Sequence, residues 1–246
     1  FHKKIKFIID KSIILIRIIF YDFNLKFFML YLKNVSYHPA ATPHPIIEDI
    51  NLTLAPQKLG LIVGVSGSGK TTLLEILAGL AERTSGDILW RTQSLTSEDL
   101  QQLCGIVFQF PERHFCGQNI LEELRLGHPE LSSDRIRETL AEVGLNHIHS
   151  YTPPHNLSGG QQRRLSLAVQ LIRQPNLLLL DEPTAGLDWL MKEQLVNLLS
   201  RLKEHWTLLV VTHDPSDLID IADDCWRLEG GKMSAIEPSL LQSKKG

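Results

Sequence analysis

The sequence has few cysteines and no closely spaced pair of them. Cys104, Cys116 and Cys225 are far apart and odd in number, and no CxxC motif occurs. This pattern argues against a zinc knuckle and a disulfide framework, and it favours a reducing compartment. No repeat and no low-complexity tract follows residue 28. With 246 residues, 43% of them hydrophobic, and a net charge of −3, the chain has an ordinary globular composition.

The first 28 residues contain no apolar run long enough for a membrane span. Such a span needs roughly 20 consecutive apolar residues, and Lys11, Arg17, Asp22 and Lys26 interrupt this segment. The segment lacks Gly, Pro and Ala, and its net charge is +4. It could lie on a membrane surface as a basic amphipathic stretch. We favour the interpretation that residues 1–28 are an extension outside the core, which then begins at Met29. A secretory signal or a transit peptide fits poorly.

Apolar runs alternate with amphipathic segments after Met29. Three runs have the pattern of strands buried on both faces: residues 59–63, 176–183 and 207–214. Three segments have helical periodicity: residues 71–79, 132–145 and 191–204. Buried strands separated by helices predict an α/β fold with a mostly parallel sheet and right-handed crossovers. Residues 30–37 alternate as a strand does, and we expect residues 48–54 to pair with them.

A glycine-rich loop lies between a predicted strand and a predicted helix. GVSGSGKTT, Gly64 to Thr72, matches the phosphate-binding pattern G-x-x-x-x-G-K-[ST] in that context. Its glycines let the backbone curl so that successive N–H groups point at a phosphate. We expect Lys70 to reach the β- and γ-phosphates, and the Thr71 hydroxyl to ligate Mg²⁺. The predicted phosphate-binding residues are Gly64, Ser66, Gly67, Ser68, Gly69, Lys70, Thr71 and Thr72.

Two further strand ends carry polar side chains. Asp181 ends a predicted strand at the sheet edge where ligands bind, and it is a candidate to hold Mg²⁺ through water. Glu182 follows and is placed to accept a proton from an attacking water. His213 ends another predicted strand and could hydrogen-bond the γ-phosphate. A pair of buried acidic residues, or a histidine at a strand end, is often structural when it occurs alone. Beside a phosphate loop we favour the catalytic interpretation for both.

A second anion site is predicted far downstream of the phosphate loop. Ser158, Gly159 and Gly160 are expected to form a turn before a helix that begins at Gln161. With this LSGGQ stretch, the motifs resemble in order and spacing the nucleotide-binding subunits of ATP-binding-cassette (ABC) transporters. The resemblance extends from Met29 to near Lys232. It implies a P-loop NTPase fold with a mostly parallel sheet, an antiparallel β subdomain, and a helical subdomain at about 110–157, all within a nucleotide-binding domain of residues 29–246.

The resemblance also implies an activity and a site shared between two chains. The chain would hydrolyse ATP to ADP and phosphate with Mg²⁺, as one member of a head-to-tail homo- or heterodimer. ATP on one phosphate loop would be capped by four residues of the other chain: Ser158, Gly159, Gly160 and Gln161. Asp188 matches the loop that crosses the dimer interface. Tyr37 matches the aromatic residue that stacks on adenine, with ordinary strand packing as the alternative.

Gln109 matches the family's glutamine that senses Mg²⁺ and water and links to the membrane partner. The resemblance implies an integral membrane permease subunit, which would hold this chain peripherally on the cytoplasmic face of the membrane. Phe110-Pro111-Glu112 after Gln109 resembles ATPases of energy-coupling-factor importers, which take up vitamins or transition-metal ions, although His114 stands where glutamine is common. Phe110 and Phe115 could form a groove for a short helix of the permease, or could anchor the helical subdomain.

Three other functions stay open at this point. One is the ATPase of an ABC exporter. Another is a non-transport ABC ATPase that acts on DNA or the ribosome, but the chain has no long coiled coil and only one cassette, and its charge after residue 28 is −7. We therefore expect no nucleic-acid partner. The third is a cassette without catalysis, which the presence of Lys70, Glu182 and His213 argues against.

Overall fold

The computed structural model describes residues 30–238 except the side chain of Glu112. The predicted extension at residues 1–28 therefore lies outside the described residues. Among the described helices, none is both long enough and apolar enough to cross a membrane.

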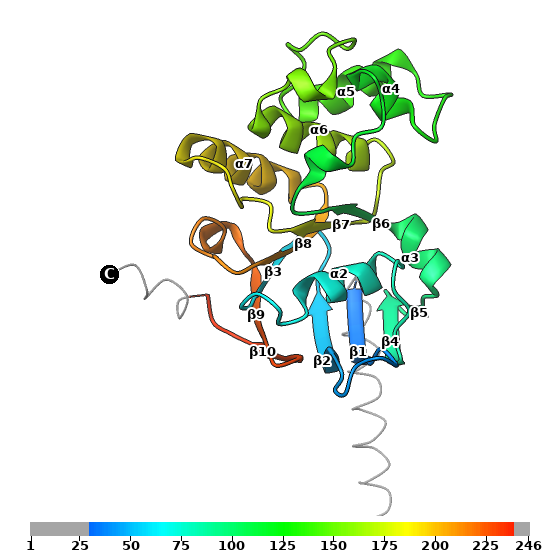
Figure 1. The fold of residues 1–246 in the computed structure, drawn as a ribbon, viewed down its shortest axis with the longest axis vertical. Helices are drawn as coiled ribbons and strands as arrows, with labels where there is room; N and C mark the ends of the chain where they lie inside the picture. Colours follow the sequence, from blue (N-terminus) through cyan, green and yellow to red (C-terminus); the bar gives the residue numbers. More distant parts are fainter. Residues whose placement is uncertain (1–29, 239–246) are drawn as a thin grey trace, which may run out of the picture.

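Residues 30–238 form two sheets with helices between and beyond them (Figure 1). One sheet has the strand order β2-β1-β4-β5, and the other has the order β10-β9-β3-β8-β7-β6. The strands are β1 (Leu30–Tyr37), β2 (Ile47–Leu54), β3 (Leu59–Val63), β4 (Ser85–Trp90), β5 (Gln93–Ser94), β6 (Cys104–Val107), β7 (Leu177–Asp181), β8 (Thr207–Thr212), β9 (Asp224–Glu229) and β10 (Lys232–Ala235). The α-helices are α2 (Lys70–Leu77), α3 (Ser97–Leu103), α4 (Ile120–Arg125), α5 (Ser133–Glu142), α6 (Gly159–Leu171) and α7 (Trp189–Leu202). The described part of the chain also contains the 3-10 helices η1 (Pro111–Arg113), η2 (Pro154–Asn156) and η3 (Ile219–Ile221).

The larger sheet is parallel except at one edge. β3 pairs in parallel with both β8 and β9, and β7 pairs in parallel with β6 and β8, whereas β10 is antiparallel to β9. The smaller sheet is antiparallel throughout, and β1 pairs with β2 as predicted. The fold class expected from the sequence is therefore confirmed.

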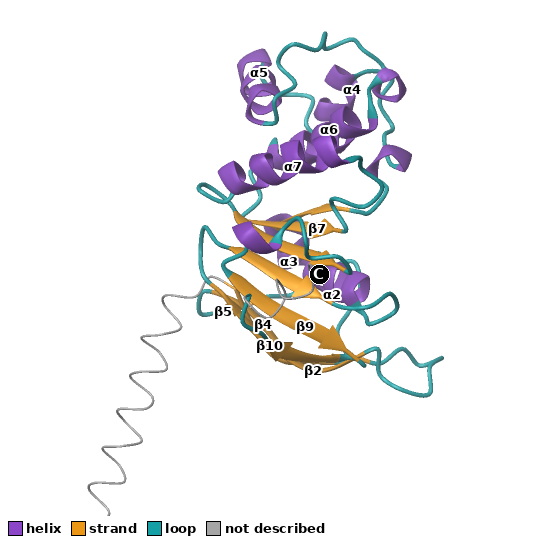
Figure 2. Ribbon diagram, turned by 90° about the vertical axis from the view of Figure 1, so that its left-hand side faces the viewer, coloured by secondary structure: helices purple, strands orange, loops and turns teal. Residues whose placement is uncertain are grey.

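The central strands of the larger sheet serve two hydrophobic cores. Leu178 and Leu180 of β7 face the core shared with the helices α4 to α7, while Leu177 and Leu179 face the core shared with α2 and the smaller sheet. This alternation explains the apolar runs, because a strand covered on both faces needs apolar residues at every position. Figure 2 shows the resulting layers, with α6 and α7 on one side of the larger sheet and α2 on the other.

Helices dominate the chain between β6 and β7. The segment predicted as a helical subdomain, about 110–157, contains η1, α4, α5 and η2. Its helices α4 and α5 lie at one end of the molecule (Figure 1). Its helices start where the sequence supplies a polar cap: Asn119 accepts a hydrogen bond from Glu122 N, and Ser132 accepts one from Arg135 N. Ile136 and Leu140 of α5 are buried in the core that the larger sheet shares with the helices α4 to α7, as the periodicity predicted.

Candidate functional site

Three neighbouring strands bring the predicted catalytic residues to one edge of the larger sheet. β8 lies between β3 and β7. Its end is therefore flanked by the phosphate loop that follows β3 and by the carboxylates at the end of β7. The Gly64 amide donates to the Thr212 carbonyl at 3.2 Å, and the Glu182 amide donates to the Val211 carbonyl at 2.9 Å. The carboxyl ends of parallel strands converge here, which is the usual place for a ligand in such a sheet.

The phosphate loop has the backbone that its glycines predict. Gly67 and Gly69 have φ angles of 80° and 100°, in the left-handed region that glycine favours. At Gly64 a side chain would collide with the carbonyl oxygen of Leu228 and with the Ser68 hydroxyl. The loop therefore depends on glycine at these positions to curl as it does.

The polar groups of this loop suit a bound anion. The Ser68 hydroxyl is buried and has no hydrogen-bond partner among the described residues. The α2 helix starts at Lys70 without a side-chain cap, which leaves its first amides available to a ligand. Lys70 is 6% exposed, and its ammonium group donates to the carbonyls of Gly64 at 2.7 Å and Val65 at 3.1 Å. A phosphate would supply these donors with a stronger, charged acceptor.

Thr71 and Asp181 meet beside the loop. The Thr71 hydroxyl donates to Asp181 Oδ2 at 2.8 Å. Burial raises the pKa of Asp181, and the charge of Glu182 raises it further, whereas the Thr71 hydrogen bond and the charge of Lys70 lower it. A hydroxyl and a carboxylate are oxygen ligands of the kind that Mg²⁺ prefers, and a cation here would relieve the cost of the buried carboxylate. These residues therefore fit a Mg²⁺ ion.

Glu182 is held by donors on both carboxylate oxygens. Its Oε1 accepts from the His213 amide at 2.9 Å, and it lies 2.8 Å from His213 Nδ1 and 3.7 Å from Lys70 Nζ. Its Oε2 accepts from the Thr212 hydroxyl at 2.8 Å. The φ angle of Glu182 is 47°, a strained value for a residue with a side chain, and such strain gathers at functional sites. Because Nδ1 of the half-exposed His213 ring faces Glu182, Nε2 is the nitrogen left for a phosphate.

Gln109 follows β6, and a residue absent from our sequence predictions fixes its backbone. Arg163 of α6 is 6% exposed, and its guanidinium donates to the Gln109 carbonyl at 2.6 Å and to the Phe108 carbonyl at 3.5 Å. The same group donates to the Ala185 carbonyl at 3.2 Å, three residues after Glu182. Arg163 thus ties the glutamine loop to the segment that follows the carboxylates. The sequence does not indicate that Arg163 is buried, because Arg163 and Arg164 are adjacent arginines in the same predicted helix.

The LSGGQ segment begins its helix earlier than we predicted. Gly159 and Gly160 belong to the first turn of α6, and Ser158 is the N-cap, so the prediction of a helix beginning at Gln161 was wrong. Ser158 Oγ accepts from the Gln161 amide at 3.3 Å, and Gln161 Oε1 accepts from the Ser158 amide at 2.9 Å. This reciprocal pair is a capping box, which nucleates the helix before the glycines. In the described structure, these residues form no hydrogen bond to the phosphate loop of their own chain.

Asp188 precedes α7 and Tyr37 ends β1, and each has local contacts of its own. Asp188 caps α7 by accepting from the Met191 amide at 2.8 Å. With Ser158, Gly160 and Gln161 it lines a hollow of about 280 Å³. Tyr37, at the end of β1, is partly buried against the core between the sheets, so it has the packing contacts that its alternative interpretation requires.

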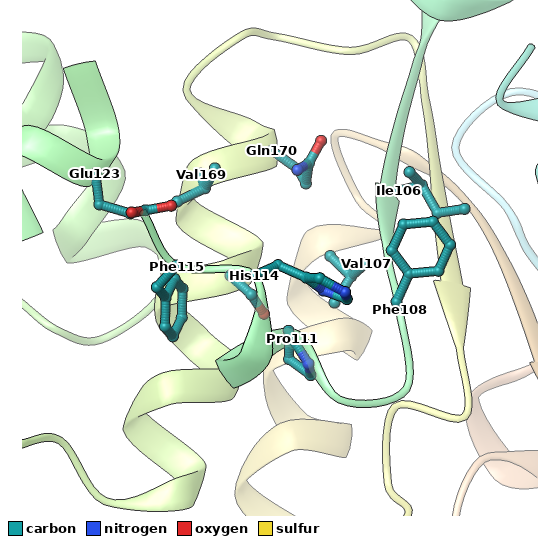
Figure 3. Close-up of a pocket in the computed structure, with 10 residues that line it drawn as sticks. Ile106, Val107, Phe108, Pro111, His114, Phe115, Glu123, Val169 and Gln170 are labelled. Carbon is teal, nitrogen blue, oxygen red and sulfur yellow. The ribbon is translucent and has the colours of Figure 1, made fainter. Parts of the chain in front are cut away.

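A second hollow lies behind the glutamine loop (Figure 3). Its volume is about 190 Å³, and its lining is mainly apolar, formed by Ile106, Val107, Phe108, Pro111, His114, Phe115, Glu123, Ser166, Val169 and Gln170. Glu123 is buried, and its carboxylate accepts from the amides of Cys116 at 2.8 Å and Gly117 at 2.6 Å. These bonds fix the exposed Cys116 beside the hollow, which we call the glutamine-loop groove. Phe110 is 41% exposed and lies outside this lining, under the Arg113 guanidinium.

Comparisons with known proteins agree with this geometry. The sequence profile of the family described as ABC transporter matches residues 47–185. The chain is 44% identical over 225 residues to ABC transporter I family member 11, chloroplastic, of Arabidopsis thaliana, which covers 85% of this chain and 81% of that protein. It is 35% identical over 238 residues to the energy-coupling factor transporter ATP-binding protein EcfA2 of Streptococcus agalactiae, with 87% and 85% covered.

A solved structure is similar over most of this chain. It is cbiO1 from Clostridium perfringens, described as part of the ABC transporter complex cbiONQ, with a TM-score of 0.81 and 26% identity, covering 89% of this chain and 92% of that one. The resemblance seen in the LSGGQ stretch and the phosphate loop is confirmed. This chain therefore belongs to the ABC transporter family, as an ATP-binding and ATP-hydrolysing subunit.

Proposed function

We propose that this chain is the ATP-hydrolysing subunit of an importer of the energy-coupling-factor type. The observation that carries the proposal is the similarity to EcfA2, which extends over 87% of this chain and 85% of the relative. The Phe110-Pro111-Glu112 sequence directly after Gln109 supports the same class.

The proposed reaction is hydrolysis at the sheet edge. Water attacks the γ-phosphorus, the bond to the bridging oxygen breaks, and Glu182 accepts the proton of the water. Lys70 and the loop amides stabilise the charge on the phosphate oxygens. Thr71 and Asp181, with Gln109 as a further predicted ligand, would hold Mg²⁺, which would neutralise phosphate charge when bound. His213 keeps Glu182 in place through its amide and offers its ring to the phosphate.

The complete site would contain two chains. The Ser158–Gln161 helix start forms no hydrogen bond to its own phosphate loop within the described residues, and it presents its amides at the surface. Large apolar side chains are also exposed near both half-sites: Val65 in the phosphate loop is 72% exposed, and Trp189 and Leu190 after Asp188 are 76% and 54% exposed. Exposed apolar residues beside incomplete polar sites support a head-to-tail pair, with this chain or a related chain as the partner.

The membrane subunit would dock at the glutamine-loop groove. An apolar lining of this size, adjoining the loop that carries Gln109, suits a short helix from a permease. The chain would then lie peripherally on the cytoplasmic face of the membrane. The Arabidopsis relative is described as chloroplastic, so a chloroplast membrane is the alternative location. Cell fractionation distinguishes the cytoplasmic face of a membrane from the chloroplast.

Phe115→Asp tests the docking assignment. We expect the charge to weaken pull-down of the permease subunit, because Phe115 lines the groove, while ATP affinity of the chain is unchanged. Phe110→Asp is the matched control, since Phe110 lies outside the lining and should have the smaller effect. Unchanged pull-down of the permease with a collapse of ATP affinity would contradict the assignment.

Uptake tests the importer class separately. Loss of the gene should lower uptake of a vitamin or a transition-metal ion, and the Glu182→Gln variant should fail to restore it. Normal uptake combined with impaired efflux would instead point to an exporter.

A further inference from the structure

Thr212 is a buried hydroxyl at the end of an otherwise apolar strand. Its strand, β8, reads TLLVVT, and Thr212 is 1% exposed. Valine has nearly the same shape and would fill this position without a polar group. A buried hydroxyl is tolerated only where hydrogen bonds replace the water it has lost. The partners of Thr212 therefore explain why a polar residue ends this strand.

Those partners connect three parts of the site. The Thr212 hydroxyl lies 2.8 Å from Glu182 Oε2, and the Asp214 amide donates to it at 3.1 Å. The Thr212 carbonyl accepts from the amide of Gly64, the first residue of the phosphate loop. Because β8 lies between β3 and β7, this one residue contacts the phosphate loop, the carboxylate and the segment after His213.

The hydroxyl has one proton and two possible acceptors. One is Glu182 Oε2 at 2.8 Å, and the other is the Asp214 carbonyl at 3.1 Å. The carboxylate is both the nearer and the charged acceptor, and charge-assisted bonds are shorter and stronger than neutral ones. The Thr212 hydroxyl therefore donates its hydrogen bond to Glu182 Oε2, and its oxygen accepts the hydrogen bond from the Asp214 amide.

Glu182 needs this second anchor because of its position. The His213 amide and ring bind Oε1, which leaves rotation of the carboxylate to be limited at Oε2. The backbone of Glu182 has a strained, positive φ angle, and such a conformation persists only where surrounding contacts hold it. The hydrogen bonds to the carboxylate are among these contacts. We propose that Thr212 is a positioning residue for ATP hydrolysis, which holds the Glu182 carboxylate in the orientation that receives the proton of water. The inference rests on the proposed role of Glu182 as the base.

Substitutions at Thr212 separate positioning from folding. Thr212→Val keeps the shape and removes the hydroxyl, and Thr212→Ala removes it without risk of crowding. We expect both to lower kcat for ATP hydrolysis by the full chain roughly 10- to 100-fold, the effect of one hydrogen bond to a charged group. KM and the affinity for ATP should stay close to wild type, because phosphate binding depends on the glycine loop and Lys70. Thr212→Ser restores the hydroxyl and should restore most of kcat.

Thr207→Val is the matched control at the other end of the same strand. Thr207 is 3% exposed, and its hydroxyl oxygen accepts from the Gln57 amide at 3.1 Å. It lies at the opposite end of β8 from Thr212. The control should therefore lower the melting temperature without lowering kcat. If Thr207→Val and Thr212→Val lower kcat equally, or if Thr212→Ser is as slow as Thr212→Ala, the positioning role is wrong.

A double variant distinguishes this inference from the proposed base itself. In a chain that already carries Glu182→Gln, adding Thr212→Val should cause no further loss of kcat, because Thr212 acts through Glu182. A further loss equal to that of the single variant would overturn the inference. If Glu182→Gln hydrolyses ATP at the wild-type rate, the base assignment fails. If Glu182→Gln is slow but Thr212→Val and Thr212→Ala are both as fast as wild type, only the Thr212 inference fails.

Discussion

Replacement of Arg163 by methionine tests how the glutamine loop is held. Methionine preserves much of the apolar stem and removes the guanidinium, which donates to the carbonyls of Gln109, Phe108 and Ala185. Two of these contacts have ordinary hydrogen-bond lengths, at 2.6 and 3.2 Å, and the third is at the 3.5 Å limit. Each bond from a charged donor contributes about 1.5–3 kcal/mol, so the two good bonds set the scale of the loss.

Two effects reduce that loss. Removing the guanidinium also removes the cost of burying its charge, and the residues Gln109 and Ala185 are only half-buried, so water can replace part of the contacts. We expect a net decrease of about 2–3 kcal/mol in the free energy of unfolding. For a domain of this size, that corresponds to a melting temperature lower by roughly 4–12 °C. The measurement is thermal unfolding of the full chain without nucleotide.

Arg164→Met is the matched control at the next position. Arg164 is half-buried and donates to Gln194 Oε1 at 2.7 Å, while burial and the charge of Arg201 lower its pKa. A group whose charged form is already disfavoured should contribute little, so we expect a change below about 1 kcal/mol. Equal melting temperatures for the two variants would refute the reasoning about the carbonyl contacts of Arg163.

Three other predictions concern the catalytic edge and the start of the chain. Glu182→Gln should retain ATP binding, slow hydrolysis by roughly 10²–10⁴-fold through loss of the base, and accumulate a dimer with Mg-ATP; a variant that stays monomeric in size-exclusion chromatography at high concentration counts against the head-to-tail pair. Asp181→Asn should raise the melting temperature of the nucleotide-free chain at neutral pH while abolishing Mg²⁺-dependent hydrolysis. The sign follows from the raised pKa of Asp181: the fold disfavours its carboxylate, so this residue's contribution to stability is greatest below the unfolded pKa, decreases as pH rises through the folded pKa, and should vanish from the pH profile of the variant. A chain that starts at Met29 should fold and bind ATP as the full chain does, and a large drop in melting temperature on truncation would show that residues 1–28 belong to the core.

Local patterns predicted the strands that carry the site. The runs around Leu61, Leu179 and Val210 have no polar side chain at their interior positions, and strands with both faces covered have that pattern wherever they pair. β6 and β9 were missed. β6 has only four residues, and β9 (DCWRLE) mixes polar and apolar residues without a continuous apolar run, so their places beside β7 and β3 depend on contacts distant in sequence.

The candidate site was predictable where a motif names its residues, and hidden where burial decides the role. Lys70 and Thr71 were selected by the phosphate-loop motif, and Asp181 and Glu182 by their place at a strand end, and the structure brings them together. Arg163 resembles any surface arginine of a helix until the fold buries it among carbonyl oxygens. Thr212 likewise ends an apolar strand, a position where the sequence cannot specify which neighbouring strand supplies its partner.

The Glu123 contacts that fix Cys116 beside the glutamine-loop groove have a practical consequence. Burial raises the pKa of the Cys104 thiol to about 12 and, with the charge of Asp224, that of Cys225 to about 11. Both thiols therefore stay protonated and shielded at neutral pH, whereas Cys116 is exposed. A maleimide dye should then label the natural chain at a single position without mutagenesis. Its emission would report, in real time, whatever approaches that face of the molecule during a turnover cycle.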